Sequence, residues 1–334
     1  MIKPDQKLII DFDWPRYAAG FAGEKRIIEV EHKATGKTMK FKNRTEFYGR
    51  GKAKDKGWIG EENKTLEVPI TVDDFNIYDI QVPEPIENVL FTAKRMIEKV
   101  QDELKSTNMV GFYGVGDCFR VERSTILKYK GNREGSLKPM QLPEITEYLV
   151  NKYKPTACTH LEADDWLIIA GQEPGTIVVS PDKDSGGFPV DWYSPLHPDW
   201  GVMDCRGFGE IWIEDEGANE KYRGVGRKFF YWQVAYGDDV DNYKANCASD
   251  IPWGKKSAFT AINETRNDRE AFEVLVKIFK DLYPHEQTIV GWRGNEIKID
   301  WLYVLKEQFD MARMYRHEHD HVNVEDVLRK YRLI

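Results

Sequence analysis

The chain has 334 residues, of which 41% are hydrophobic and 31% are charged, so it can form a packed core and is not a disordered protein. This length corresponds to about two domains, or to one domain with a large insertion. The formal net charge of −8 excludes a uniformly basic nucleic-acid binder. The stretch from Lys33 to Lys56 is nevertheless strongly basic, with Glu46 and Asp55 as its acidic residues.

The sequence predicts no membrane segment. No apolar stretch is long enough for a transmembrane helix, and the first residues do not combine a basic region with a long apolar run. The four cysteines include no CxxC pair, which is typical of a reducing compartment. We therefore expect a cytoplasmic protein without a signal peptide or membrane partner.

The N-terminal part is predicted to be rich in strands. A buried strand at residues 7–11 ends in the acidic residue Asp11. Residues 26–44 alternate in polarity around the turn ATGK and predict a hairpin, residues 48–64 are expected to form a mobile loop, and residues 65–82 predict two more strands. The stretch 21–84 is therefore expected to be a β-rich, basic insertion.

The remainder alternates between helices and strands. The predicted elements, in order, are a helix from Ile86 to Leu104, a strand ending at Asp117, a helix at 142–153, a helix opened by Glu162, Asp164 and Asp165, a strand at 176–180, two or three strands within 206–235 that include EIWIE and KFFYWQV, and helices near 268–282 and 298–316. Such alternation predicts an α/β fold with a parallel sheet.

Acidic residues follow the predicted strands at matching positions. Asp11 and Asp117 end two strands, and Asp182 follows a third. Because sites in open α/β sheets form outside the carboxyl ends of the strands, these residues are expected to meet at one edge. The expected set also includes Glu162, Asp164, Asp165, Asp184, Asp238 and Asp241. Crowded carboxylates favour a hard cation such as Mg²⁺, and two such ions about 4 Å apart can promote phosphodiester hydrolysis.

Each acidic segment also has a simpler interpretation. Acidic residues at a helix start are often caps that complement the helix dipole, and Asp182, Asp184 and the GDDVDN sequence can be turn residues. A basic segment, Lys128 to Arg133 (KYKGNR), places cationic groups around Tyr129 and suits a phosphate contact with a stacking side chain, although a solvated loop would show the same pattern.

Taken together, four motifs resemble the 5′-nuclease superfamily of flap endonucleases and bacteriophage 5′–3′ exonucleases. They are KYKGNR at 128–133, EADD at 162–165, DKD at 182–184 and GDDVDN at 237–242. The resemblance covers residues 7–13 and 108–260. It implies a PIN-like α/β core with a central, mostly parallel sheet flanked by helices. The resemblance does not cover the stretch 21–84 and is weak after residue 265, and there the residue patterns predict a β-rich N-terminal insertion and a helical C-terminal part.

The resemblance also implies roles for individual residues. Asp11, Asp117, Glu162 and Asp164 would hold a first metal ion, and Asp165, Asp182, Asp184, Asp238 and Asp241 would hold or orient a second. Lys130 and Arg133 would contact the scissile phosphate and act in catalysis with Asp164 and Asp182. The DNA contacts would come from Arg120, Lys128, Tyr129, Lys130, Asn132, Arg133, Lys255 and Lys256.

Two regions depart from the family pattern. The segment from Pro252 to Ala258 resembles the family's turn between two helices, which binds duplex backbone, but it keeps a single glycine, Gly254. The span between Asp184 and Asp238 contains extra predicted strands that could reshape the path of the substrate strand.

The expected organisation is a split core (residues 1–20 and 85–245), the insertion 21–84 and a helical duplex-binding part at 246–334. The resemblance implies a monomeric, Mg²⁺-dependent 5′–3′ exonuclease or flap endonuclease, with Mn²⁺ as a substitute, that acts on DNA 5′ ends, flaps or RNA–DNA hybrids in bacteriophage replication or repair, in the host cytoplasm. Two alternatives are a haloacid-dehalogenase-type phosphatase with Asp11 as nucleophile and Asp13 as acid/base, and a nucleic-acid binder that has lost catalysis.

Overall fold

The computed structural model describes residues 6–214 and 220–334, apart from the side chains of residues 52–54 and 117. By its contacts the chain divides into two compact units. Of the described residues, the first unit holds 6–14, 98–137, 152–214 and 220–334, and the second holds 15–97 and 138–151. The three-part organisation expected from the sequence stays a prediction.

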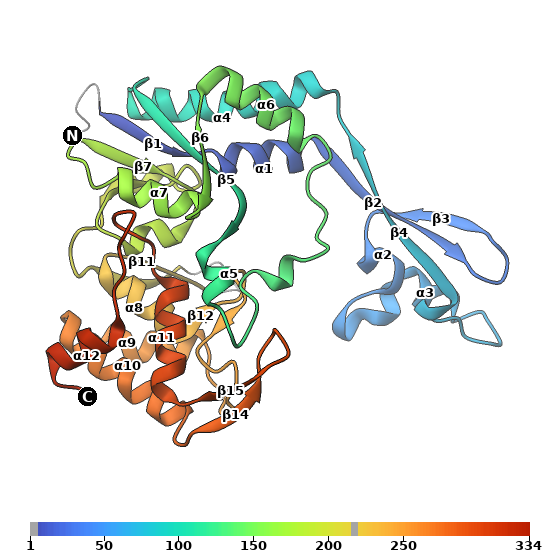
Figure 1. Cartoon of the computed structure of the whole chain (residues 1–334). Helices are drawn as coiled ribbons and strands as arrows, with labels where there is room; N and C mark the ends of the chain where they lie inside the picture. The colour runs from blue at the N-terminus through green and yellow to red at the C-terminus, as the bar shows by residue number, and fades with distance from the viewer. Residues whose placement is uncertain (1–5, 215–219) are drawn as a thin grey trace. The chain divides into compact units, whose positions relative to one another are not determined.

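The first unit contains a six-stranded sheet with the order β6-β5-β1-β7-β8-β9 (Figure 1). Its strands are β1 (Lys7–Asp11), β5 (Met109–Cys118), β6 (Thr156–His160), β7 (Thr176–Val179), β8 (Asp191–Tyr193) and β9 (Val202–Asp204). All neighbours are parallel except β9, which runs antiparallel to β8. The mixed α/β fold with a central, mostly parallel sheet is therefore confirmed.

Strand β1 lies at the centre of this sheet because its side chains are apolar on both faces. Leu8, Ile9 and Ile10 are completely buried, as is typical of a parallel strand covered on both sides. In the register, Ile10 lies opposite Gly111 of β5 and Val179 of β7. The carboxyl ends of the three strands therefore come to the same edge of the sheet.

Helices and short hairpins complete the first unit. The helices are α5 (Phe119–Arg123), α7 (Ala163–Ala170), α8 (Arg227–Tyr236), α9 (Lys255–Asn263), α10 (Asp268–Leu282), α11 (Trp301–Ala312) and α12 (Val324–Tyr331). The hairpins pair β10 (Glu210–Glu214) with β11 (Lys221–Val225), β12 (Gly237–Asp238) with β13 (Tyr243–Lys244), and β14 (Gln287–Val290) with β15 (Glu296–Ile299). One apolar core joins the sheet to α8, α10 and α11.

The second unit is built around a three-stranded antiparallel sheet with the order β3-β2-β4 (Figure 1). Its strands are β2 (Glu24–His32), β3 (Thr38–Phe41) and β4 (Phe75–Pro83), and its helices, some of which extend into the first unit, are α1 (Asp13–Ala22), α2 (Arg44–Tyr48), α3 (Trp58–Glu62), α4 (Ile86–Leu104) and α6 (Leu142–Tyr153). Val30, Phe47 and Phe75 are buried in a small core of their own. The predicted hairpin at 26–44 and the helix beginning at Ile86 are confirmed.

Some sequence predictions for local structure were wrong. The stretch 48–64 is not a continuous loop, because it contains α3 and a 3₁₀ turn, η1 (Gly51–Lys56). In 65–82, β4 is the strand that forms, and another 3₁₀ turn, η2 (Val72–Asp74), precedes it. After Asp241 the chain is mostly helical, as predicted, but the hairpin of β14 and β15 was missed.

The segment KFFYWQV forms most of helix α8 rather than the predicted strand. Its aromatic residues favour a strand locally, and Phe229, Trp232 and Val234 are all buried. Because neighbouring structure covers nearly every side of this helix, no amphipathic stripe marks it in the sequence.

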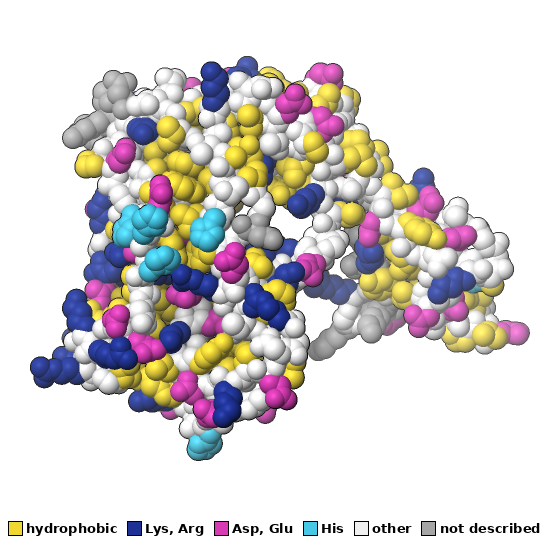
Figure 2. Space-filling model, viewed as in Figure 1, with side chains coloured by type: hydrophobic (Ala, Val, Ile, Leu, Met, Phe, Trp, Pro, Cys, Tyr) yellow, Lys and Arg dark blue, Asp and Glu magenta, His cyan; other side chains and the backbone are white. Residues whose placement is uncertain are grey.

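The charged residues show no gathering of one sign on the face drawn in Figure 2, where basic and acidic side chains are interspersed. Within the described ranges, no helix has the length and apolar character needed to cross a membrane.

Candidate active site

The carboxylates of Asp11, Asp164 and Asp182 come together at the carboxyl edge of the sheet. Asp11 ends β1, Asp182 follows β7, and Asp164 lies in the first turn of α7. Burial raises the pKa of Asp164 well above its usual value, and the charges of Asp11 and Asp182 raise it further. The structure therefore places these acidic groups within electrostatic reach of one another, as the strand positions predict.

Asp11 is held in place by its own turn. Its Oδ1 accepts hydrogen bonds from the backbone N–H groups of Asp13 (2.8 Å) and Trp14 (3.3 Å), and its Oδ2 accepts one from the Ser180 hydroxyl (3.3 Å). Burial, with the charge of Asp13 as the next cause, raises the pKa of Asp11 to about 7. Asp13 itself accepts a hydrogen bond from Gly114 N at 3.0 Å, so it also faces this region.

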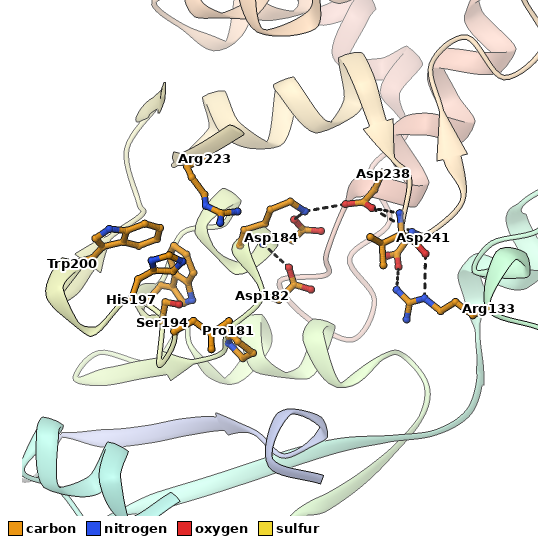
Figure 3. Close-up of a pocket in the computed structure, with 14 residues that line it drawn as sticks. Arg133, Pro181, Asp182, Asp184, Ser194, His197, Trp200, Arg223, Asp238 and Asp241 are labelled. Atoms are coloured by element: carbon orange, nitrogen blue, oxygen red, sulfur yellow. Dashed lines mark hydrogen bonds and ion pairs between the residues drawn. The ribbon is translucent and has the colours of Figure 1, made fainter. Parts of the chain in front are cut away.

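A second acidic group forms around Lys183. The Lys183 ammonium lies 2.6 Å from Asp184 Oδ1 and 2.9 Å from Asp238 Oδ2 (Figure 3). Burial and Asp182 raise the pKa of Asp184 to about 7, although Lys183 opposes them. Burial also acts to raise the pKa of Asp238, but Lys183 and the backbone N–H groups of Val240 and Asp241 together outweigh it and the net pKa is lowered.

Lys130 is the cation closest to Glu162. Its Nζ lies 2.5 Å from Glu162 Oε1. Burial opposes ionisation of Glu162, but Lys130 and Arg120 outweigh burial and lower its pKa to about 2. Burial likewise opposes the charge on Lys130, yet Glu162 and Asp241 raise its pKa. The pair therefore stays ionised around neutral pH.

The loop that carries Lys130 is interlocked with the loop after β12. Lys130 N donates to Asp241 O at 2.9 Å, and Asn132 Nδ2 donates to Asp239 O at 2.7 Å. In the other direction, Asn242 Nδ2 donates to Lys128 O at 2.9 Å. These bonds fix residues 128–133 beside residues 238–242, which lie more than one hundred positions later in the chain.

Arg133 extends this contact toward solvent. Its Nε donates to Val240 O at 3.1 Å and its Nη2 lies 2.5 Å from Asp241 Oδ1 (Figure 3). Burial and Glu162 raise the pKa of Asp241, while Lys130 and Arg133 act in the opposite direction. With 47% of its side chain exposed, Arg133 is accessible to a ligand.

Arg120 differs from its predicted role as a DNA contact. It is 2% exposed, and its guanidinium forms a two-pronged pair with Asp165, at 2.8 Å for each bond. It also donates to Glu162 and to the backbone oxygens of Met311 and Arg313. In this structure Arg120 is therefore shielded from solvent and positions the acidic residues.

Tyr129 and Asp165 are also built into the interior. The Tyr129 hydroxyl lies 2.9 Å from Glu162 Oε2 and 2.8 Å from Asp241 Oδ2 and can donate to either, and the buried ring does not offer the stacking surface expected from the sequence. Besides Arg120, Asp165 accepts hydrogen bonds from Glu162 N and Tyr315 N. Of the two roles expected for Asp165, this arrangement suits orientation of neighbouring groups.

The remaining predicted DNA contacts lie on the surface. Lys128 pairs with Glu134, and Asn132 is used in the interlocked loops. Lys255 and Lys256 are the first residues of α9, and Lys255 lies 3.4 Å from Asp239. The segment before them is not a helix, in contrast to the turn between helices that the sequence resembles. Asp117 lies in β5, but its side chain is outside the described residues.

Sequence reasoning missed Lys183. The sequence feature that could have indicated a role for Lys183 is its position between the two aspartates of DKD, where a cation can neutralise both neighbours. It also missed a pocket of about 270 Å³ beside this lysine, whose lining includes Asp182, Asp184, His197 and Trp200. The pocket residues between Trp192 and Arg223 come from the span between Asp184 and Asp238, which departs from the family pattern.

The donor atoms of this site fit a hard divalent cation. They are carboxylate oxygens, and burial together with neighbouring carboxylates raises the pKa values of Asp11, Asp164 and Asp184, so a bound cation would favour their ionised forms. Within the described part of the chain, however, no group of three or more His, Cys, Asp or Glu side chains is already arranged to hold a metal. Lys130 and Lys183 pair with carboxylates instead, and a bound cation would compete with them.

The protein has a mixed α/β fold. Carboxylates and cations cluster at the carboxyl edge of its sheet. No protein-family model matches this sequence. No curated protein matches it either. Solved structures similar to this chain include nucleases of bacteriophage T5.

Two of these structures have 15% sequence identity to the chain and cover 67% of it. The T5 D15 protein co-crystallised with metal ions is covered to 79% with a TM-score of 0.38. The T5 D15 flap endonuclease in a pseudo-enzyme–product complex with DNA and metal ions is covered to 90% with a TM-score of 0.34.

Proposed function

We propose that this protein is a divalent-metal-dependent nuclease that hydrolyses phosphodiester bonds of DNA. The observation that carries the proposal is the crowding of Asp11, Asp164 and Asp182 beside Lys130, in a site where burial and neighbouring carboxylates raise the pKa of Asp11 and Asp164. Such a group of oxygens has a strong tendency to bind hard cations. The adjacent cationic side chains suit a phosphate that carries developing charge.

The acidic and the basic side chains of the site would have different roles. Asp11, Asp164, Asp182 and Asp184, together with Glu162 and Asp238, would hold the metal ions, while Asp165 and Arg120 keep the start of α7 in place. When bound, divalent ions would neutralise these carboxylates and assist attack of water on the phosphodiester. Lys130 and Arg133 would bind the phosphate and stabilise its charge, because the interlocked loops hold both against the acidic group.

The sequence motifs favour one substrate class among nucleases. KYKGNR, EADD, DKD and GDDVDN favour a 5′–3′ exonuclease or flap endonuclease that uses Mg²⁺, with Mn²⁺ as an alternative. The basic stretch of the second unit would help to hold DNA through contacts with phosphates, without reading its sequence. An RNA strand in an RNA–DNA hybrid is a further candidate substrate.

A cleavage assay tests the function directly. The wild-type protein is incubated with a 5′ flap, a nicked duplex and an RNA–DNA hybrid, each in Mg²⁺, in Mn²⁺ and in EDTA. We expect cleavage from the 5′ end that depends on the metal and leaves 5′ phosphates. The matched variant Asp164→Asn, which removes one charge with little change in shape, should be inactive. Absence of cleavage on all three substrates, or full activity in EDTA, would overturn the proposal.

A further inference from the structure

The pocket beside the carboxylates has two unlike walls. Figure 3 shows Asp238, Asp241 and Arg133 on one side and the rings of His197 and Trp200 on the other. Asp182 and Asp184 lie between the two walls. A single nucleotide has the same polarity, with a charged phosphate at one end and a flat aromatic base at the other.

The aromatic wall is formed by the segment between β8 and β9. The His197 ring stacks on the Trp200 ring, with centroids 4.0 Å apart and planes inclined by 7°. The Trp200 ring is contacted edge-on by Trp192 at 6.1 Å and by Trp212 at 6.0 Å. These contacts hold the Trp200 ring in place on its buried side. His197 is the outer ring of the stacked pair.

The same wall is tied to the acidic residues. Trp192 Nε1 donates to Ser180 O at 2.9 Å, and the Ser180 hydroxyl in turn donates to Asp11. The backbone N–H of Asp182 donates to the Ser180 hydroxyl oxygen at 3.1 Å. Ser180 therefore sets the distance between the stacked rings and the carboxylates, as a binding subsite for one end of a substrate requires.

Two further features distinguish this wall from ordinary core packing. Leu196 is 62% exposed, and the side chain of His197 is 24% exposed, so the outer ring of the stacked pair remains accessible. Ser194, which is 2% exposed and lines the pocket, has a hydroxyl with no hydrogen-bond partner among the described residues. A buried hydroxyl without a partner costs free energy unless a ligand satisfies it.

We propose that His197, Trp200 and Ser194 form a nucleobase-binding subsite beside the catalytic carboxylates. The base would stack on the outer face of His197, its edge would reach Ser194, and its phosphate would lie toward Arg133. Arg223, which lines the same pocket and is held by Glu214 at 3.1 Å, would face the nucleotide from the β11 side. This inference rests on the proposed nuclease function and specifies how the nucleotide next to the cleaved bond is held.

The chemistry of the subsite favours a base over other ligands. Stacking accepts every base because each has a π-face, so the subsite would strengthen binding without strict sequence preference. The carboxylates beside the rings disfavour a small inorganic anion, which has no base to stack on His197. The pocket also mixes charged and aromatic groups, which does not suit an acyl chain.

Binding without metal separates the subsite from catalysis. A short 5′-phosphorylated single strand that carries the fluorescent base 2-aminopurine is titrated with protein in EDTA. Stacking on His197 should quench the fluorescence. His197→Ala should remove the quenching and weaken binding about tenfold, whereas His197→Phe, which keeps a flat ring, should retain both. His285→Ala, at an exposed histidine away from the pocket, is the matched control.

An abasic substitution localises the effect. Strands that lack the base at one position are compared with intact strands, and His197→Ala should cost nothing on the abasic strand whose missing base occupied the subsite. Ser194→Ala should weaken binding of the intact strand but not of that abasic strand. Equal affinities and equal quenching for the wild type, His197→Ala and His197→Phe would overturn the subsite.

The two proposals fail in different ways. If the wild type binds the strand through His197 but cleaves no substrate with Mg²⁺ or Mn²⁺, the nuclease function is wrong and the subsite remains. If the wild type cleaves and His197→Ala cleaves intact and abasic substrates with the wild-type ratio, the subsite is wrong and the nuclease function remains. Loss of binding in both His197→Ala and His197→Phe would show that stacking does not hold the base.

Discussion

Lys130 and Asp241 contact each other through both backbone and side chain. The backbone N–H of Lys130 donates to Asp241 O at 2.9 Å, and Lys130 Nζ lies 3.9 Å from Asp241 Oδ1. Lys130 adopts a left-handed backbone conformation (φ 55°) at this point. The backbone bond therefore fixes where the ammonium group enters the site, and this placement is the basis of its expected role.

Replacement of Lys130 by Ala should lower turnover strongly and DNA binding only modestly. The half-buried ammonium group lies beside Glu162 and is placed to stabilise charge that develops on the phosphate, which contributes mainly to the rate. Single-turnover cleavage and equilibrium binding measure the two effects. Lys298→Ala, at an exposed lysine paired with Glu286, is the control. An unchanged cleavage rate would remove Lys130 from the active site.

Asp164→Ala and Asp182→Ala should each abolish hydrolysis almost completely while DNA binding is largely retained. Both residues belong to the acidic group that would hold the metal ions, and neither is needed for the basic contacts with phosphate. Rates are measured at saturating protein with Mg²⁺, alongside binding titrations. If either variant cleaves at the wild-type rate, the assignment of a metal site to these carboxylates is wrong.

Asp13→Asn and Asp164→Asn separate the nuclease from the phosphatase alternative. In a phosphatase with Asp11 as nucleophile, Asp13 would serve as acid/base. Asp13→Asn would then reduce activity more than Asp164→Asn. In the nuclease, Asp164→Asn should be inactive. Both variants are assayed on a phosphate monoester and on 5′-labelled DNA. Activity on the monoester that disappears with Asp13→Asn alone would favour the phosphatase.

Stability without metal should fall as the pH rises from about 4 to above 7. The pKa of Asp11 is raised from 3.8 to about 7 in the folded protein, mainly by burial, so the folded state binds a proton that the unfolded state has released. The pKa of Asp184 is also raised to about 7, so this residue should likewise lower stability as the pH rises. Thermal unfolding in EDTA across this range measures the effect, and Asp11→Asn should flatten it.

Metal binding should reverse this trend. Since divalent ions bind the ionised carboxylates, Mg²⁺ or Mn²⁺ should raise the unfolding temperature more at pH 8 than at pH 5, with release of protons. The wild type and Asp11→Asn are compared under both conditions. Equal stabilisation at the two pH values would show that the metal does not bind the groups with raised pKa.

The basic stretch of the second unit should contribute to the salt dependence of DNA binding. Lys37, Lys42 and Arg50 are exposed. Replacing all three with Ala should reduce the slope of log affinity against log salt by about one for each phosphate contact that is lost. Binding to a duplex is measured between low and moderate salt. A slope equal to that of the wild type would show that this surface faces away from DNA.

The sequence predicted the scaffold of the site more fully than its contacts. Apolar strands that end in an acidic residue gave the positions of Asp11 and Asp182, because parallel strands bring their carboxyl ends to one edge. Helix α4 (Ile86–Leu104) was predicted to begin at Ile86, because apolar residues from Ile86 to Leu104 fall on one face. By contrast, α8 has no such face and was predicted as a strand.

Side-chain partners could not be predicted from local patterns. Arg120 was expected to contact DNA from the family resemblance, and Tyr129 from its place between basic residues, yet both face inward toward Glu162. Their partners are distant in sequence, and no periodicity reports such pairs. The stacked pair of His197 and Trp200 was missed for the same reason, since its position beside Asp182 depends on the pairing of β8 with β7.

The interlocked loops have a consequence for the order in which the protein matures. Residues 128–133 can take their final positions only when Asp239, Val240 and Asp241 are available to accept their hydrogen bonds. During synthesis the ribosome releases the earlier acidic residues first, so a growing polypeptide carries Asp11 and Asp164 before Lys130 and Arg133 are anchored. The emerging chain would therefore remain inert until translation has passed the β12–β13 hairpin.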